Sequence, residues 1–375
     1  MIKIIVFLLP TQLGLHFWPS FSRVAGIKVD YLSPTLYFVD ILLILLLTLN
    51  IRRIQISIKN NLLITSAFVF FVVLNTYFSI SPANSLFWWL RFVLYLLTFI
   101  VFRLRDLSWE QIRNPLFYST VLVVSLELAQ LINQSSIGGI FYYLGERAYG
   151  ATTPAIGRLS LLGQEILRPI STFSHANSLA GYLLIVFYMF SKKSSSSWYK
   201  VVPFLGILLT LSKTAIFGLA IVIFNIRPEI TIIVSVILTT IQPFIQNITS
   251  NTQSISERLF FFNYQKKLML QNIFSGVGLG GYIPSLGNQL PGSFLTPAKL
   301  QPIHNLPYLM FTEIGIIGTA LSLLTVIKKK VWQFITNPLV LGLIAIVIFT
   351  GVFDHYSWTL PQNRLIILLA LAIML

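Results

Sequence analysis

His304 and Asn305 are the residues best suited to chemistry in this chain, and they open the apolar run LPYLMFTEIGIIG. Nine residues separate Asn305 from Gly315, and Gly318 follows. Imidazole titrates near neutral pH, so a histidine at the start of a helix can take a proton from a hydroxyl group. The polar stretch before it, residues 248–303, adds cationic side chains: Arg258, Lys266, Lys267 and Lys299. A base beside a basic loop predicts chemistry on an anionic, lipid-borne substrate.

Composition predicts that these residues are positioned by an all-α polytopic membrane protein, forming one integral membrane domain over residues 1–375. Hydrophobic residues make up 55% of the chain and charged residues 10%, and the mean hydropathy is +0.81. Apolar runs of about 15–20 residues, the length that crosses a bilayer core, recur throughout. The absence of cysteine excludes thiol catalysis and disulfides. The net charge of +15 is spread over short loops, which indicates membrane topology before nucleic-acid binding, so membrane lipids and no nucleic acid are expected as partners.

About twelve spans are expected. They cover residues 2–17, 35–50, 62–78, 86–102, 114–133, 175–190, 201–212, 213–226, 229–247, 304–327, 335–352 and 358–375. The first run follows a single lysine and lacks a convincing small-residue cleavage site, so it is interpreted as a retained helix. An inside N-terminus places the KKSSSSWYK and KKK turns in the cytoplasm, as the positive-inside rule requires. Both termini are then cytoplasmic. One long helix over residues 201–226 would invert everything downstream.

Two large outer loops are predicted, over residues 134–174 and 248–303. In the first, Arg168 precedes a Ser/Thr-rich turn, and Ser174 or Asn177 is suited to cap the next helix. In the second, a capping box that starts at Ser254 predicts a helix over residues 256–274, lying at the membrane interface or covering a cavity. GVGLGG has no preceding strand, so a flexible turn is favoured over a nucleotide site.

Charged and imidazole side chains are expected to gather near the outer face. Asp40, Arg91 and Glu127 lie at similar depths in apolar spans, where an unpaired charge is costly. They predict either a shared hydrated cavity or an Arg–carboxylate pair that joins helices. Glu313 lies deeper and is assigned to an interhelical hydrogen bond or the cavity floor. All four histidines, His16, His175, His304 and His355, also fall near the outer side. None has metal-ligand spacing, so no metal site is expected.

Several segments together resemble the O-antigen ligase and O-antigen polymerase superfamily. They are RPISTFSHANSLAGYLL from Arg168, TLSKTAIFGL around Lys213, ERLFFFNYQKKLMLQNIFSGVGLGGY with Arg258, HN-x9-G-x-x-G from His304, and the ending FDHYSWTLPQNR. Each motif alone is weak, and their order and spacing make the resemblance. Lys213 stands where the family has an arginine. Lysine keeps the positive charge but lacks the planar guanidinium that can bind phosphate with two hydrogen bonds.

The resemblance implies a GT-C-like glycosyltransferase of the bacterial inner membrane that functions in lipopolysaccharide or other surface-polysaccharide biosynthesis. Its donor would be a glycan on undecaprenyl pyrophosphate, and its acceptor a hydroxyl of a glycan or lipid-linked molecule. Arg258, Arg168 and Lys213 would hold the pyrophosphate, His304 would be the general base, and Asn305 would orient His304 or cap its helix. Asp40, Arg91 and Glu127 would support the site. No cofactor and no metal would be required.

Three functions stay open from the sequence. A ligase would move a finished glycan to a lipid A core or another acceptor, and a polymerase would add the growing chain to a new repeat unit. An exporter or flippase would explain a cationic cavity without catalysis. Transporters commonly contain two similar halves with broken helices, and the sequence shows no obvious repeat of this kind.

Overall fold

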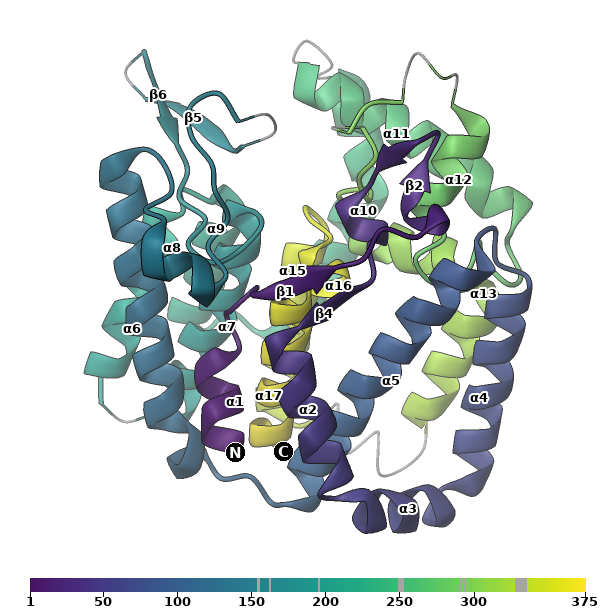
Figure 1. Ribbon diagram of the computed structural model, residues 1–375, viewed down its shortest axis with the longest axis horizontal. Coiled ribbons are helices and arrows are strands. Elements are labelled where there is room, and N and C mark those ends of the chain that lie inside the picture. The colour runs from purple at the N-terminus through teal and green to yellow at the C-terminus, as the bar shows by residue number, and fades with distance from the viewer. Residues whose placement is uncertain are drawn as a thin grey trace.

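The protein is described by a computed structural model, which covers residues 1–153, 156–161, 163–194, 196–248, 253–290, 292, 295–297, 299–327 and 336–375. Side chains are described for these residues except 161, 243–248, 253–260 and 323–327. The described chain is mostly helical, with three short antiparallel strand pairs. The expected all-α class is therefore correct in its main feature (Figure 1).

The helices follow one another with short connections in most of the chain. The first half contains α1 (Ile2–Leu8), α2 (Phe38–Thr48), α3 (Ile51–Asn60), α4 (Leu62–Tyr77), α5 (Pro82–Leu104) and α6 (Trp109–Asn133). The second half contains α7 (Ala176–Lys193), α8 (Trp198–Leu209), α9 (Lys213–Ile223), α10 (Pro228–Ile248), α11 (Gln253–Gln271), α12 (Tyr282–Gln289), α13 (Leu306–Ile327), α15 (Pro338–Gly351), α16 (Tyr356–Thr359) and α17 (Pro361–Met374).

The strands form three pairs: β1 (Gly14–His16) pairs with β4 (Thr35–Tyr37), β2 (Arg23–Val24) with β3 (Ile27–Lys28), and β5 (Arg158–Leu161) with β6 (Gln164–Leu167). The strands β5 and β6 lie in the first predicted loop, β2 and β3 lie between the first two predicted spans, and β1 and β4 lie at the ends of those two spans. In the first pair His16 lies opposite Thr35. Both chain termini lie at one end of the molecule, and β5, β6, α11 and α12 lie at the other (Figure 1).

α7 is the central helix of the main hydrophobic core. Almost every residue from Ala176 to Phe190 is buried, because the sequence of this helix is apolar on all sides. α7 contacts α6, α8, α9, α15, α16 and α17. Gly181 allows one close approach, since a Cβ atom there would lie 2.3 Å from the Tyr356 hydroxyl oxygen. The packing around α7 thus fixes the position of the α16 segment.

Only α5 and α6, among the described residues, are both long and apolar enough to be clear candidate membrane spans. α2 and α3 would form a third candidate if counted as one span, but they are bent by 72° at their junction. Each of the twelve predicted spans overlaps a helix, and several of these helices are shorter than 18 residues. A membrane protein with two clear candidate spans is therefore supported, and the twelve-span topology stays a prediction.

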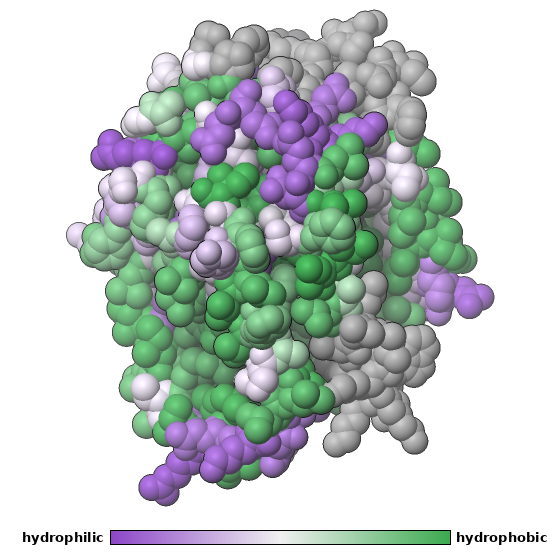
Figure 2. Space-filling view, turned by 90° about the vertical axis from the view of Figure 1, so that its right-hand side faces the viewer, coloured by the Kyte–Doolittle hydropathy of each residue, from purple (hydrophilic) through white to green (hydrophobic). Residues whose placement is uncertain are grey.

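The molecular surface agrees with a membrane location. Figure 2 shows a wide hydrophobic belt on one side of the molecule, with hydrophilic residues concentrated above and below it. Exposed apolar side chains include Leu63, Phe70 and Val73 on α4 and Leu90 on α5. An apolar belt of this extent exceeds the patches that soluble monomers usually expose.

The predicted helix over residues 2–17 is wrong in length. α1 ends at Leu8, and the chain then turns and enters β1. Pro10 explains the early end, because proline has no backbone N–H and its ring blocks the preceding helical turn.

By contrast, the predicted break inside residues 201–226 is present. α8 ends at Leu209 and α9 begins at Lys213, with Leu211 in a left-handed conformation at φ 54°.

The two glycine motifs of the sequence meet at a break in α13. Gly315 has φ 63° and ψ −172°, a backbone conformation that is nearly exclusive to glycine. The carbonyls of Thr312 and Glu313 accept hydrogen bonds from the N–H groups of Val277 and Gly278, at 2.9 and 3.1 Å. The GVGLGG segment is therefore a tightly packed turn bonded to α13, and the expectation of a flexible turn is wrong in that respect.

Candidate functional site

A cavity of about 710 Å³ brings together residues from both halves of the chain. All four histidines, which the predicted topology places on one side of the membrane, line this cavity. The cationic residues on its wall are Arg91 and Arg147, and its acidic residues are Asp30 and Asp354. Its volume lies within the range of small-molecule binding sites. The four histidines come from β1, the α7 start, the segment before α13 and the segment before α16.

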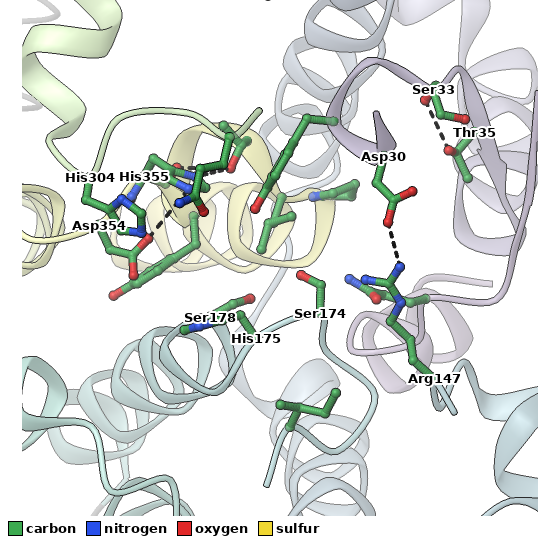
Figure 3. Close-up of a pocket in the computed structure, with 18 of the residues that line it drawn as sticks. Asp30, Ser33, Thr35, Arg147, Ser174, His175, Ser178, His304, Asp354 and His355 are labelled. Carbon is green, nitrogen blue, oxygen red and sulfur yellow. Dashed lines mark hydrogen bonds and ion pairs between the residues drawn. The ribbon is translucent and has the colours of Figure 1, made fainter. Parts of the chain in front are cut away.

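His304, Asp354 and His355 form the densest polar group of this cavity. One potential ligand atom from each residue lies within 4.8 Å of the other two. The His304 and His355 rings meet edge to face, with centroids 5.3 Å apart. Figure 3 shows the three side chains together on one wall, with the Asp30–Arg147 pair across the cavity. Sequence spacing gave no indication of this group, because 49 positions separate residue 304 from Asp354 and only folding joins them.

Burial and charge define the protonation states in this group. Burial lowers the pKa of His355 to about 3, despite the opposing effect of Asp354. Burial alone would raise the pKa of the Asp354 carboxyl, but His304, His355, His175 and a hydrogen bond from Asn177 together hold it well below its usual range. At neutral pH, Asp354 is thus a carboxylate beside a neutral His355.

Neighbouring polar side chains hold Asp354 and His355 in place. Asn177 Nδ2 donates to Asp354 Oδ2 at 2.9 Å, and the backbone N–H of His355 donates to Asp354 Oδ1 at 2.8 Å. The Thr359 hydroxyl is hydrogen-bonded to His355 Nδ1 at 2.8 Å. Both side chains are therefore fixed by the packing of α16 against α7.

Asn305 has the capping role that the sequence suggested. Its Oδ1 accepts a hydrogen bond from the Tyr308 N–H at 3.2 Å, and its Nδ2 donates to Gln242 Oε1 at 2.7 Å. Asn305 thus caps the start of α13 and links α13 to α10 by a hydrogen bond.

The start of α7 differs from expectation. His175 is the N-cap, and its Nδ1 accepts from Asn177 N at 3.2 Å, so neither Ser174 nor Asn177 caps this helix.

Arg168 is connected to the histidine group through Asn177. Its Nη2 donates to Asn177 Oδ1 at 2.7 Å and its Nε donates to the Thr210 carbonyl at 2.9 Å. Burial lowers the pKa of Arg168. The side chain is not among the residues that line the cavity, and neither is that of Lys213, which is exposed at the start of α9. Arg168 thus occupies a position behind the Asp354 wall.

The Arg258 side chain lies outside the described residues, although residue 258 belongs to α11. The next turns of this helix do reach the site. Phe261 and Phe262 line the cavity, and the buried Gln265 donates from Nε2 to Thr312 Oγ1 at 3.0 Å. α11 therefore forms part of the cavity wall, which fits the second of its two expected roles, at the membrane interface or covering a cavity.

Asp40 and Arg91 form an ion pair between two helices. Such a pair is one of the two arrangements expected for the charged residues in the predicted spans. Arg91 Nη2 lies 3.1 Å from Asp40 Oδ2, and both side chains are buried. Tyr95 donates to Asp40 Oδ1 at 3.2 Å, so the carboxylate is well satisfied. Arg91 also lines the cavity, whereas Glu127 does not. The pair joins α2 to α5, and the shared cavity includes only part of the predicted trio.

Glu127 and Glu313 have different surroundings. Neither carboxylate oxygen of Glu127 has a hydrogen-bond partner among the described residues, and Oε2 lies 3.2 Å from an ideal Cβ position on Gly206. Glu313 Oε2 accepts a hydrogen bond from Trp358 Nε1 at 2.9 Å. That bond joins α13 to α16, which is the interhelical role expected for Glu313.

Comparisons with models of protein families, with curated proteins and with solved structures find no match to this chain. They give no indication of the superfamily that the motifs resemble. The fold and the site must therefore be interpreted from their own geometry.

Proposed function

We propose that this protein is a membrane glycosyltransferase related to O-antigen ligases and polymerases. It transfers a glycan from undecaprenyl pyrophosphate to an acceptor hydroxyl at the outer face of the bacterial inner membrane. The observation that supports this proposal most strongly is that four histidines, a buried carboxylate and two arginines line one cavity of an apolar helical protein. In the full proposal the chain has a GT-C-like arrangement of about twelve spans and cytoplasmic termini.

His304 is assigned as the general base. It takes the proton of the acceptor hydroxyl, whose oxygen attacks the anomeric carbon of the donor glycan. The bond from that carbon to the pyrophosphate oxygen breaks, and undecaprenyl pyrophosphate leaves. Asp354, in the same cluster, stabilises the imidazolium that forms on His304. Lipid pyrophosphate is already an activated leaving group, so the reaction needs no nucleotide or metal.

The proposed pyrophosphate contacts fall into two sets. Arg147 and Arg91 line the cavity, and Arg147 forms an exposed ion pair with Asp30 at 2.8 Å. An exposed pair of this kind is weak, so a phosphate group can compete for the guanidinium. Arg168, Lys213 and Arg258 are assigned by the motifs alone. Arg168 supports this function by holding Asn177 against Asp354.

Incubation of the purified protein with undecaprenyl-pyrophosphate-linked repeat units tests the proposal. Lengthened chains identify a polymerase, and transfer only to an added acceptor identifies a ligase. Absence of transfer, with movement of the lipid-linked glycan across proteoliposomes, would replace the proposal by the exporter or flippase alternative.

His304→Ala is the decisive variant for the assigned base. Loss of general-base catalysis lowers the rate by about 10²–10⁴-fold, while the protein stays folded in detergent. His16→Ala removes an imidazole that is bonded to Thr35 at 3.0 Å within the same cavity. We expect this control to retain at least about a tenth of the wild-type rate. Wild-type transfer by the His304 variant would exclude His304 as the base.

A further inference from the structure

The His304–Asp354–His355 group has the donor chemistry of a transition-metal site. It offers two imidazole nitrogens and one carboxylate oxygen, all within 4.8 Å of one another. His355 Nδ1 is hydrogen-bonded to Thr359, which leaves its Nε2 facing Asp354 Oδ1 at 4.0 Å. Ligand atoms on a tetrahedral Zn²⁺ lie about 3.3 Å apart, given metal–ligand bonds of about 2.0–2.1 Å. Small side-chain rotations therefore suffice to bring the three donors to one ion.

The surroundings of these donors resemble the outer shell of a metal centre. Thr359 fixes the ring of His355, and Asn177 Nδ2 bonds to the second carboxylate oxygen of Asp354. Metal-binding histidines and carboxylates are commonly oriented by such hydrogen bonds. Asp354 and His355 are buried, whereas His304 is partly exposed at the cavity wall. The cavity beside them provides room for a water molecule as a fourth ligand.

We propose that His304, Asp354 and His355 bind Zn²⁺ or a similar borderline divalent cation, and that the bound cation inhibits the protein. Imidazole ligands favour Zn²⁺ over Mg²⁺ or Ca²⁺, which prefer all-oxygen sites. The inhibition rests on the proposed function, because a His304 lone pair bound to Zn²⁺ cannot accept the proton of the acceptor. Binding itself does not depend on that function.

Titration with Co²⁺ tests whether the metal site exists, independently of any transfer activity. The full-length protein, purified in detergent without a histidine tag, is titrated with Co²⁺, whose visible absorption increases in a tetrahedral site. We expect one saturable absorbing site in the wild type that Zn²⁺ displaces. His355→Gln removes a ligand and abolishes the absorption. Thr359→Val removes the hydrogen bonds of this hydroxyl to the His355 ring and to the His355 carbonyl, keeps all three metal ligands, and weakens Co²⁺ binding by about 10–100-fold.

His16→Ala is the matched control for the cobalt titration, because His16 lines the same cavity outside the group. It should bind Co²⁺ as the wild type does. Folding is monitored by thermal denaturation, in which Zn²⁺ should raise the melting temperature of the wild type and of His16→Ala but not of His355→Gln. Absence of saturable binding to the wild type, or equal binding by His355→Gln and His16→Ala, would overturn the site.

The transfer assay separates the inhibitory role from the proposed function. Added Zn²⁺ should lower transfer at the concentrations that displace Co²⁺, and a chelator should restore it. Stimulation of transfer by Zn²⁺, or binding without any effect on transfer, would overturn inhibition and leave the metal site. A protein that binds Co²⁺ but transfers no glycan, either with or without added metal, would leave the site intact and refute only the proposed function.

Discussion

Asp354→Asn tests the role of the carboxylate beside His304 directly. The substitution keeps the shape of the side chain and one acceptor oxygen, which can accept from Asn177 Nδ2 or from the His355 backbone N–H but not from both. It removes a negative charge whose oxygen lies within 4.8 Å of a His304 ring nitrogen. The change therefore removes electrostatic stabilisation of the imidazolium and one accepted hydrogen bond, while the volume of the side chain stays the same.

The expected loss follows from Coulomb's law. Two unit charges 4.8 Å apart interact by about 3.5 kcal/mol at an effective dielectric constant of about 20. If the imidazolium forms in the transition state, the loss of this interaction lowers the rate by several hundredfold, since each 1.36 kcal/mol is about tenfold. The predicted decrease is thus about 10²–10³-fold in the rate of glycan transfer at saturating substrate.

A single-turnover assay, with the protein in excess over the lipid-linked donor and saturating acceptor, measures this rate separately from product release. Glu165→Gln is the matched control, because its carboxylate pairs with Arg158 on the exposed β5–β6 hairpin and does not line the cavity. It should transfer glycan at the wild-type rate. A rate for Asp354→Asn within about threefold of wild type, in a protein with unchanged melting temperature, would refute the proposed stabilisation of His304.

Three further predictions concern stability and donor binding. Burial lowers the pKa of His355 from 6.5 to about 3, so the unfolded chain binds this proton first as the pH falls. Its contribution to folding stability is complete above about pH 6.5 and decreases toward pH 3, by up to about 1.4 kcal/mol per pH unit; thermal melts of His355→Gln should show a weaker pH dependence. Gly315→Ala should destabilise the protein by about 2–5 kcal/mol for two reasons. The backbone at this position has a conformation that only glycine adopts readily, and the added Cβ would lie 2.4 Å from the Phe274 carbonyl oxygen. Gly26→Ala has a positive φ and open space, so its melting temperature should decrease much less, and an equal decrease would contradict the clash. Arg147→Ala should raise the KM for the lipid-linked donor by about tenfold, whereas Arg158→Ala, away from the cavity, should leave it unchanged; equal effects would indicate a nonspecific cationic surface.

The helices were predictable because their signals are local. Apolar runs, the break between α8 and α9 and the Asn305 cap depend on residues that are close in sequence. The end of α1 was missed although Pro10 was visible, because the apolar pattern continues past it. The cap of α7 was also missed, since histidine is a less common N-cap than serine or asparagine.

The candidate site was only partly predictable. His304 was identified from its position before an apolar run. The four histidines were expected only on one side of the membrane, and the structure shows that they line one cavity. Asp354 and His355 received no role in the mechanism, although both stand in the FDHYSW motif. A carboxylate followed directly by a histidine near an outer helix end is the signal that could have identified them. The direct role assigned to Arg168 in phosphate binding stays a prediction, and its described contacts are to Asn177 and Thr210.

The sequence by itself determined the apolar helical character of the protein, because burial in a bilayer requires long apolar segments that composition reveals. It also determined which residue types could accept a proton or bind phosphate. Only the tertiary structure decided that α16 packs against α7 and brings Asp354 and His355 to His304, and that the glycine turn locks onto the break at Gly315. These contacts join residues separated by many positions, and no local pattern specifies such packing.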